Sequence, residues 1–483
     1  MSVVTHTQAR KGRIPELLLL TLALAIGLIA YYLVHVGTGG TGLPGNMATM
    51  TILAVVIAVG AHLVIRHVAP YADPVLFPSA LALNGVGLAM IYRVDVASES
   101  NKVSSQLVLS AVGIIFMVGT VVVLRDHRLL RRFTWTSLIL GIVLLLLPLV
   151  PGIGIGFQGA RIWISVAGFS FQPAELAKIC FAVFFAGYLV SERDNLSLAG
   201  PKILGLHLPK ARHMVPLLLA WLLSMGTLAA EKDFGTAILF FGLFVAMLYA
   251  ATERVSWIII GALLTAVGVA TLVEAMPHIQ ARFTIWLHAL DADVYDAQYG
   301  SYQLVQGLFG MASGGLFGTG LGAGYPTKSY AANSDFIMAS LGEEIGLVGL
   351  LALLSIYLLL VMRGLRTAVF LRDGFGKLLA AGLSFAIAIQ CFVVVGGVTR
   401  VIPLTGLAMP FLAHGGSALL ANWIIIGLLL RISDAARRPA AADPLPPPEI
   451  LEQIPEYEQD ANSSESPEDE PSHSQETQVV NIR

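Results

Sequence analysis

Residues 234–251 read FGTAILFFGLFVAMLYAA, a stretch without one charged side chain. A helix of this length spans about 27 Å, close to the thickness of a bilayer's hydrocarbon core. Similar apolar windows lie near 16–36, 48–66, 75–92, 106–124, 133–151, 173–191, 214–230, 255–275, 335–361, 376–396 and 405–430. The sequence therefore predicts an all-α polytopic membrane protein with about twelve transmembrane helices.

The composition excludes a water-soluble globular protein. Of the 483 residues, 56% are hydrophobic and 12% charged, with a mean hydropathy of +0.77, whereas soluble domains are about 25% charged. The net charge of −2 is the sum over two unlike regions. Residues 1–438 hold 28 basic and 20 acidic groups, whereas residues 439–483 hold 1 basic and 11 acidic groups. Membrane topology accounts for the basic surplus, so we expect no nucleic acid partner.

The distribution of lysine and arginine predicts the orientation. With a cytoplasmic amino terminus at residues 1–14 and alternating loops, 21 basic residues lie inside and 7 outside, while Lys178 falls within a span. This bias predicts that both termini are cytoplasmic. Residues 439–483 are rich in proline, glutamate and serine, and are predicted to be a disordered acidic cytoplasmic tail. Two long loops, 151–172 and 274–334, then lie outside, where we expect any chemistry.

Several ionisable side chains lie in or beside the apolar runs, where a charge costs ~2.5–3.5 kcal/mol. They are Glu175, Lys178, Asp233, Asp335, Glu343 and Glu344. Glu175 and Lys178 are three residues apart and share a helix face. Structural ion pairing explains such groups at least as well as a role in binding.

The loop 274–334 combines carboxylates with aromatic rings: Arg282, Trp286, Asp291, Asp293, Tyr295, Asp296, Tyr299 and Tyr302. Rings stack on sugar faces and carboxylates accept hydroxyl protons, so the composition suits a carbohydrate. A solvated loop with interfacial tyrosine and tryptophan anchors explains it as well. The glycines of residues 318–322 lack the βαβ context of a nucleotide-binding loop, and are predicted to form a hinge or a backbone contact.

Several motifs occur in one order along the chain. They are GARIWI at 159–164, FQPAELAK at 171–178, DFGTA at 233–237, SDFI at 334–337, GEEIG at 342–346 and PLTGLAMPFLAHGGS at 403–417. Together they resemble the SEDS family over roughly residues 75–432. Around residues 406–431 the chain is more similar to RodA-like members than to FtsW-like ones.

This resemblance implies a ten-span core, here residues 71–438, preceded by two extra spans at 15–70. It further implies a peptidoglycan glycosyltransferase that polymerises lipid II at the outer face of the cytoplasmic (inner) membrane, in cell-wall elongation and cell-shape maintenance. The implied partner is a class B penicillin-binding protein. A lipid II flippase, a division-specific FtsW-like glycosyltransferase and a non-catalytic scaffold remain alternatives.

The resemblance also implies site residues. The family's catalytic aspartate lies in the large outer loop, six residues before a tyrosine, and this spacing selects Asp296 and Tyr302. Ala297 replaces the family's usual proline there. The leaving pyrophosphate needs positive charge, which a divalent cation (Mg²⁺ or Mn²⁺) or basic side chains can supply. The expected substrate-binding residues are Arg161, Trp163, Lys178, Arg282, Tyr302 and Arg400, and the metal ligands are left unassigned.

Overall fold

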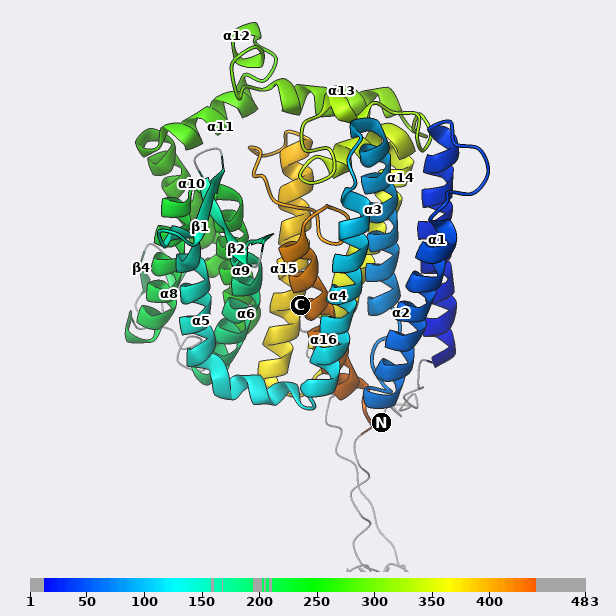
Figure 1. Cartoon of the computed structure of the whole chain (residues 1–483). Helices are drawn as coiled ribbons and strands as arrows, with labels where there is room; N and C mark the ends of the chain where they lie inside the picture. Colours follow the sequence, from blue (N-terminus) through cyan, green and yellow to red (C-terminus); the bar gives the residue numbers. More distant parts are fainter. Residues whose placement is uncertain are drawn as a thin grey trace, which may run out of the picture. The chain divides into compact units, whose positions relative to one another are not determined.

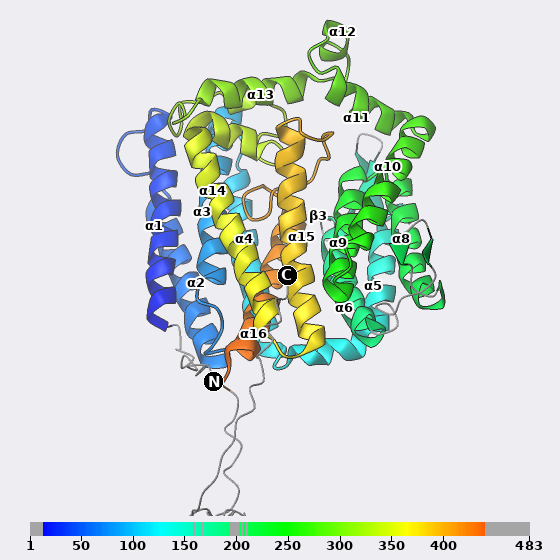
Figure 2. The same cartoon turned by 180° about the vertical axis from the view of Figure 1, so that it is seen from behind.

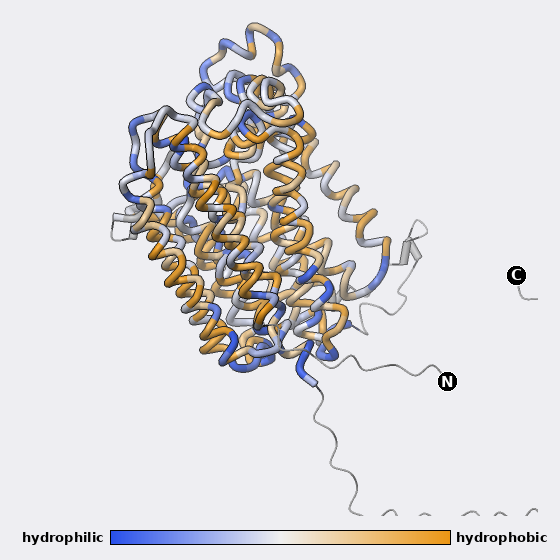
Figure 3. Tube along the Cα trace, turned by 90° about the vertical axis from the view of Figure 1, so that its right-hand side faces the viewer, coloured by the Kyte–Doolittle hydropathy of each residue, from blue (hydrophilic) through white to orange (hydrophobic). Residues whose placement is uncertain are grey.

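The computed structural model describes residues 13–157, 160–166, 168–193, 202–203, 206–207 and 211–439. Residues 1–12 of the predicted amino terminus, Gly159 of the GARIWI motif and residues 440–483 of the predicted tail lie outside the described residues. Within the described part, twelve helices are long and apolar enough to cross a membrane. The prediction of a polytopic helical membrane protein is confirmed, and apolar residues dominate along these helices (Figure 3).

The elements follow the predicted spans closely. The long helices are α1 (Arg13–Gly37), α2 (Met47–Val68), α3 (Leu76–Ser98), α4 (Lys102–Val123), α5 (Thr134–Leu146), α6 (Ala174–Ser191), α8 (Ala211–Glu231), α9 (Phe234–Thr252), α10 (Ser256–Ala275), α14 (Ile337–Phe370), α15 (Gly374–Val398) and α16 (Gly416–Arg437). Short 3-10 helices, η1 (His127–Phe133) and η2 (Leu147–Leu149), flank α5.

The large loop is itself helical. It contains α11 (Pro277–Leu287), α12 (Ala292–Tyr295), α13 (Tyr302–Gly314) and the 3-10 helix η3 (Pro326–Lys328). Figures 1 and 2 show α11, α12 and α13 across one end of the long helices. Helix α1 begins and α16 ends at the opposite end (Figure 1).

The other long loop forms a small sheet that the sequence did not predict. Strands β1 (Gly154–Phe157), β2 (Ala160–Val166) and β3 (Phe169–Phe171) pair antiparallel in that order, with Ile155 opposite Trp163 and Ile164 opposite Phe171. Gly168 has a φ of +84° at the turn between β2 and β3, a conformation that favours glycine. Strands β4 (Lys202–Ile203) and β5 (Leu206–His207) pair antiparallel in a second sheet.

The last span differs most from its prediction. The expected helix at 405–430 is instead α16, Gly416–Arg437, and residues 399–415 form an irregular segment. Pro403 and Pro410 lack the N–H that a helix interior needs, and Gly406 has a φ of +76°. The prediction, which relied on apolar composition alone, therefore began this span too early in the chain. Helix α14 is longer than predicted and is kinked at Gly346, where φ is +68°.

The interior of the bundle consists mainly of α3, α6, α15 and α16, whereas few residues of α2, α5 and α10 are buried. Small residues let these helices approach closely, as is common in membranes. A Cβ atom on Gly113 of α4 would lie 2.3 Å from Cδ1 of Trp423 on α16. This glycine therefore sets how closely α4 packs on α16.

Candidate active site

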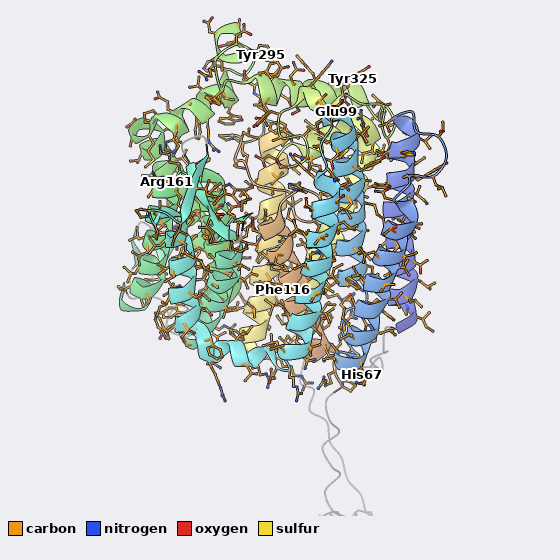
Figure 4. All side chains as sticks on the ribbon, viewed as in Figure 1. His67, Glu99, Phe116, Arg161, Tyr295 and Tyr325 are labelled. Carbon is orange, nitrogen blue, oxygen red and sulfur yellow. The ribbon has the colours of Figure 1, made fainter. Side chains whose placement is uncertain are left out.

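Asp296 follows α12 directly, and its side chain is exposed. Its neighbour Tyr295 lies at the tip of the molecule in Figure 4. The loop that carries Asp296 is closed at its base, where the buried hydroxyl of Ser301 donates to the carbonyl of Ala289 (2.6 Å) and the Ser301 N–H donates to the carbonyl of Val294 (3.0 Å). The carboxylate is thus presented to solvent on a short loop whose ends are tied together.

Tyr302, the tyrosine of the predicted motif, begins α13 and is about half exposed. Its ring lies 5.4 Å from the ring of Tyr295, centroid to centroid. Gln306 Nε2 donates to the Tyr295 hydroxyl at 2.8 Å. The structure therefore brings Asp296 and an ordered aromatic pair onto the same loop.

The other two acidic residues of this loop differ in their contacts. Asp291 Oδ2 lies 3.1 Å from Nδ1 of His288, so its carboxylate pairs within the loop. Asp293 lies on α12 and is exposed. It provides a matched comparison for Asp296, three residues away.

Arg282 of α11 lies beneath the loop and joins it to the irregular segment. Its Nη1 donates to the carbonyl oxygens of Leu404 (2.9 Å) and Thr405 (3.1 Å). Burial lowers the pKa of Arg282, and the negative charges of Asp233 and Asp335 oppose this shift. The guanidinium of Arg282 and the carboxylates of Asp233 and Asp335, which are distant in the sequence, thus interact electrostatically here.

Asp233 caps the first turn of α9. Its carboxylate accepts the backbone N–H of Thr236 (3.0 Å) and the hydroxyl of Thr236 (2.7 Å), and Gln172 Nε2 donates to it at 3.3 Å. Burial raises the pKa of Asp233, while these hydrogen bonds and Arg282 act in the opposite direction. The residue is therefore primarily a helix cap within the charged group.

Asp335 precedes α14 and faces Gly406, where a Cβ atom would lie 3.6 Å from Asp335 Oδ2. Burial raises the pKa of Asp335 to about 6, although a hydrogen bond with Ser334 and the charge of Arg282 lower it. Such a carboxyl titrates near neutral pH. The charge of Asp335 within the Arg282 cluster therefore depends on pH near neutrality.

Lys178 is almost fully buried, with 1% of its surface exposed. Its Nζ donates to Glu175 Oε2 (2.6 Å), Gln390 Oε1 (2.9 Å) and Asn422 Oδ1 (3.2 Å). Three acceptors match the three N–H bonds of an ammonium group. These contacts support the structural interpretation of Lys178 and Glu175 over the substrate-binding one.

Glu343 and Glu344 hold the glycine-rich segment that follows α13. Glu343 Oε1 accepts the N–H of Tyr325 and Glu344 Oε2 the N–H of Gly322, both at 2.9 Å. Arg93 Nε donates to Glu344 Oε1 at 2.8 Å. Arg93 is therefore the cation that pairs with Glu344, and the glycine-rich segment makes the expected backbone contacts.

The remaining candidates lie in two places. Arg400 Nε and Nη2 donate to the carbonyls of Trp286 (2.7 Å) and Leu287 (2.8 Å), and Trp286 Nε1 donates to the carbonyl of Arg400 (3.0 Å). Arg161 is exposed on β2, below α11 in Figure 4, and Trp163 lies on the same strand, partly buried. Arg400 thus fastens α11, while Arg161 presents its charge to solvent.

The structure also identifies site residues that sequence reasoning missed. Gln390 and Asn422 complete the shell of Lys178, and Gln172 contacts Asp233. The sequence did carry a signal for two of these residues: Gln390 and Asn422 are amide side chains within apolar spans, and such groups need partners in a membrane. In the part of the chain that the structure describes, no three His, Cys, Asp or Glu side chains are placed to hold a metal ion.

The family model of FtsW, RodA and SpoVE, described as cell cycle protein, matches residues 74–438. The chain belongs to the FtsW/RodA/SpoVE family. Proteins named peptidoglycan glycosyltransferase RodA are similar to it. The one from Mycobacterium tuberculosis is 44% identical over 89% of this chain and 92% of its own length, and the one from Mycobacterium leprae is 45% identical over 80% and 82%.

Other members of the FtsW/RodA/SpoVE family are more distant. A probable peptidoglycan glycosyltransferase FtsW from Geobacter metallireducens is 33% identical over 75% of this chain and 94% of its own. This difference confirms the prediction of a closer likeness to RodA than to FtsW.

Two solved structures share the fold. One, from work on polymerisation and crosslinking by a peptidoglycan synthase complex, has a TM-score of 0.59 at 23% identity and covers 76% of this chain and 98% of its own. RodA of Thermus thermophilus has a TM-score of 0.51 at 23% identity, over 75% and 96%.

The contacts of Lys178 predict that Lys178→Ala destabilises the fold. Removing one partner of a buried ion pair leaves the other charge uncompensated, at a cost of about 3–5 kcal/mol. We expect a lower melting temperature and a lower folded yield in detergent, measured by fluorescence-monitored unfolding and size-exclusion chromatography. The double variant Glu175→Gln, Lys178→Met, which removes both charges, should recover most of the loss. Unchanged stability of Lys178→Ala would contradict the assignment.

The raised pKa of Asp335 predicts a pH-dependent stability difference between the wild type and Asp335→Asn. The folded-state pKa of about 6 lies above the unfolded value of about 3.9. Its contribution to stability is therefore present at low pH and is lost as pH rises through 6. The melting temperature of the wild type, relative to Asp335→Asn, should fall between pH 4 and pH 6 and then level off. A constant difference over this range would show that Asp335 does not titrate there.

Proposed function

We propose that this chain polymerises lipid II into glycan strands at the outer face of the cytoplasmic membrane, with Asp296 as the catalytic base. The enzyme class itself, peptidoglycan glycosyltransferase, is confirmed by relatives named RodA and FtsW. The higher identity to RodA relatives supports the role in elongation and cell shape over a division-specific role. The observation that carries the proposal is the exposed Asp296 carboxylate on a loop closed by Ser301.

The reaction requires a base for the acceptor sugar. Asp296 would take the proton from the 4-hydroxyl, and that oxygen would attack the anomeric carbon of the donor as its lipid pyrophosphate leaves. A carboxylate is a weak base toward a sugar hydroxyl, so positioning against the hydroxyl must supply much of the effect. Both substrates keep their lipid tails in the bilayer, which explains why the loop stands on membrane spans.

The leaving pyrophosphate develops negative charge that must be neutralised. Of the four predicted cations, Lys178, Arg282 and Arg400 donate to protein oxygen atoms, whereas Arg161 is exposed on β2. Arg161 is therefore the basic side chain we favour for this role, with Trp163 beside it on the strand. A divalent cation would be held by the pyrophosphate with one or two carboxylates, as Mg²⁺ commonly is.

The proposed orientation places α11, α12 and α13 outside. The first and last described helices then have their free ends on the cytoplasmic side, in agreement with the excess of basic residues predicted there. A class B penicillin-binding protein would cross-link the product. The fold shared with a protein of a peptidoglycan synthase complex supports assembly with such a partner.

The competing proposal is a lipid II flippase without chemistry. Buried charges could line a polar path through the membrane, but Lys178 and Glu344 are each bonded within the protein. Fluorescent lipid II separates the possibilities: polymer formed in detergent indicates an enzyme, and movement across liposomes without polymer indicates a flippase. If neither polymer formation nor lipid movement is observed, the non-catalytic scaffold remains.

Asp296→Asn should abolish glycan polymerisation by the purified protein, because the amide keeps the size of the side chain but cannot accept the proton. A loss of 10²-fold or more is expected for a general base. The measurement is polymer formation from fluorescent lipid II, resolved by gel electrophoresis, with the chain supplied together with its class B partner. Melting temperature and membrane insertion should not change.

Asp293→Asn is the matched control, since Asp293 is also exposed on this loop but lacks the spacing to Tyr302. It should retain most of the activity. Normal chain growth by Asp296→Asn, or an equal loss in both variants, would refute the assignment of the base.

A further inference from the structure

Helices α1 and α2 lie outside the residues matched by the family model, yet they are packed firmly on the core. A Cβ atom on Gly27 of α1 would lie 2.9 Å from Cα of Gly85 on α3, so the two backbones nearly touch. At the end of α1, Gly37 is in equally close contact with the backbone of Leu321 and Gly322. The extra helices are therefore a fixed part of the structure.

Polar contacts join α1 to α2 at two levels. At one level, the buried Glu16 pairs with Arg66 and with Nδ1 of His62, the latter at 3.1 Å. At the other, Asn46 Nδ2 donates to the Tyr31 hydroxyl at 3.0 Å. Glu16 and Tyr31 are fifteen residues apart, about 22 Å along the helix.

A cavity lies between these two levels. It opens to one side and is walled by α1, α2, α3 and α4. Small side chains create it, among them Ala23, Ala54 and Ala111 together with Gly27 and Gly85. The polar contacts at the two levels fix the spacing of α1 and α2. Between these levels the side chains are too small to fill the space that remains among the helices.

The polar side chains that line the cavity are bonded to the protein. Asn84 Nδ2 donates to the carbonyl of Phe411 (3.2 Å), Ser110 Oγ to the carbonyl of Gln106 (2.8 Å), and Tyr31 is bonded to Asn46. The remaining lining is apolar. An occupant that needs no hydrogen bond, a hydrocarbon chain, matches this surface.

The end of the cavity at Tyr31 determines which hydrocarbon fits. His35 Nδ1 lies 3.0 Å from the Tyr92 hydroxyl, and the rings of Tyr31 and Tyr92 stack at 4.3 Å. The nearby Arg93 is bonded to Glu344 and to the carbonyl of Gly324. This end therefore offers hydroxyl, amide and imidazole groups, which suit a phosphodiester headgroup better than the more highly charged pyrophosphate of a prenyl carrier.

We propose that the cavity between α1, α2, α3 and α4 binds one acyl chain of a membrane phospholipid, with the headgroup near Tyr31 and Tyr92. The lining runs about 12 Å along α1, from Ala23 to Tyr31, and so accommodates most of the length of a chain within one leaflet, which is half of a hydrocarbon core of about 30 Å. An empty cavity would forfeit the dispersion contacts of its walls, and the acyl chain restores them.

Native mass spectrometry of the full chain tests this proposal. The protein is purified in detergent, given dioleoylphosphatidylglycerol, and its lipid adducts are counted. The wild type should retain one phospholipid under conditions that strip the others. Ala54→Phe and Ala111→Leu, which fill the cavity from opposite walls, should lower the occupancy of this adduct about tenfold, because the chain and the larger side chain compete for one volume.

Val56→Phe is the matched control, since Val56 lies two residues from Ala54 on α2 and is 62% exposed on its outer face. It should retain the adduct, and all three variants should keep their melting temperature within a few degrees or raise it. Equal retention by wild type, Ala54→Phe and Ala111→Leu would overturn the proposal, as would the absence of an adduct on the wild type. Displacement of the phospholipid by equimolar undecaprenyl phosphate would overturn the choice of occupant.

Discussion

The buried ammonium group of Lys178 is the interaction on which the arrangement of the core depends most. A cation at this depth is tolerated only with partners, and its partners come from three helices: Glu175 on α6, Gln390 on α15 and Asn422 on α16. Rotating or sliding any one of these helices would leave the charge unpaired. The same requirement is met by Arg93 with Glu344 and by Arg66 with Glu16. Buried charge thus fixes the register of helices that apolar packing alone would allow to slide.

The outer loop is built on this fixed framework. Arg282 and Arg400 join α11 to the irregular segment between α15 and α16 through backbone carbonyls. Ser301 closes the smaller loop that carries Asp296. Two acidic groups are consequently available at this end with different environments: Asp296 is exposed, whereas Asp335 is buried beside Arg282 with a raised pKa. Asp296 is the proposed base because of the motif spacing, and its exposure is compatible with access by two large lipid-linked sugars.

The sequence predicted the spans because their length and lack of charge reflect the bilayer directly. The choice of Asp296 rests on its spacing to Tyr302, which is local in the sequence, and stays a prediction. The sequence indicated the pairing of Lys178 with Glu175 but not with Gln390 and Asn422, because these lie 212 and 244 residues further along the chain. Nor did it predict the irregular segment 399–415, where apolar residues mask the effect of Pro403, Gly406 and Pro410. Arg400 was predicted to be a substrate-binding residue. Its carbonyl partners at α11 could not be predicted, because they are distant in the sequence and close only in the folded structure.

A structure of the chain with two lipid II molecules, or a donor and an unreactive acceptor analogue, would test the central claim most directly. The account predicts that a carboxylate oxygen of Asp296 lies within about 3.2 Å of the acceptor's 4-hydroxyl. If that hydroxyl instead lies within hydrogen-bonding distance of Asp335 or Asp233, with Asp296 remote from both sugars, the assignment of the base is wrong.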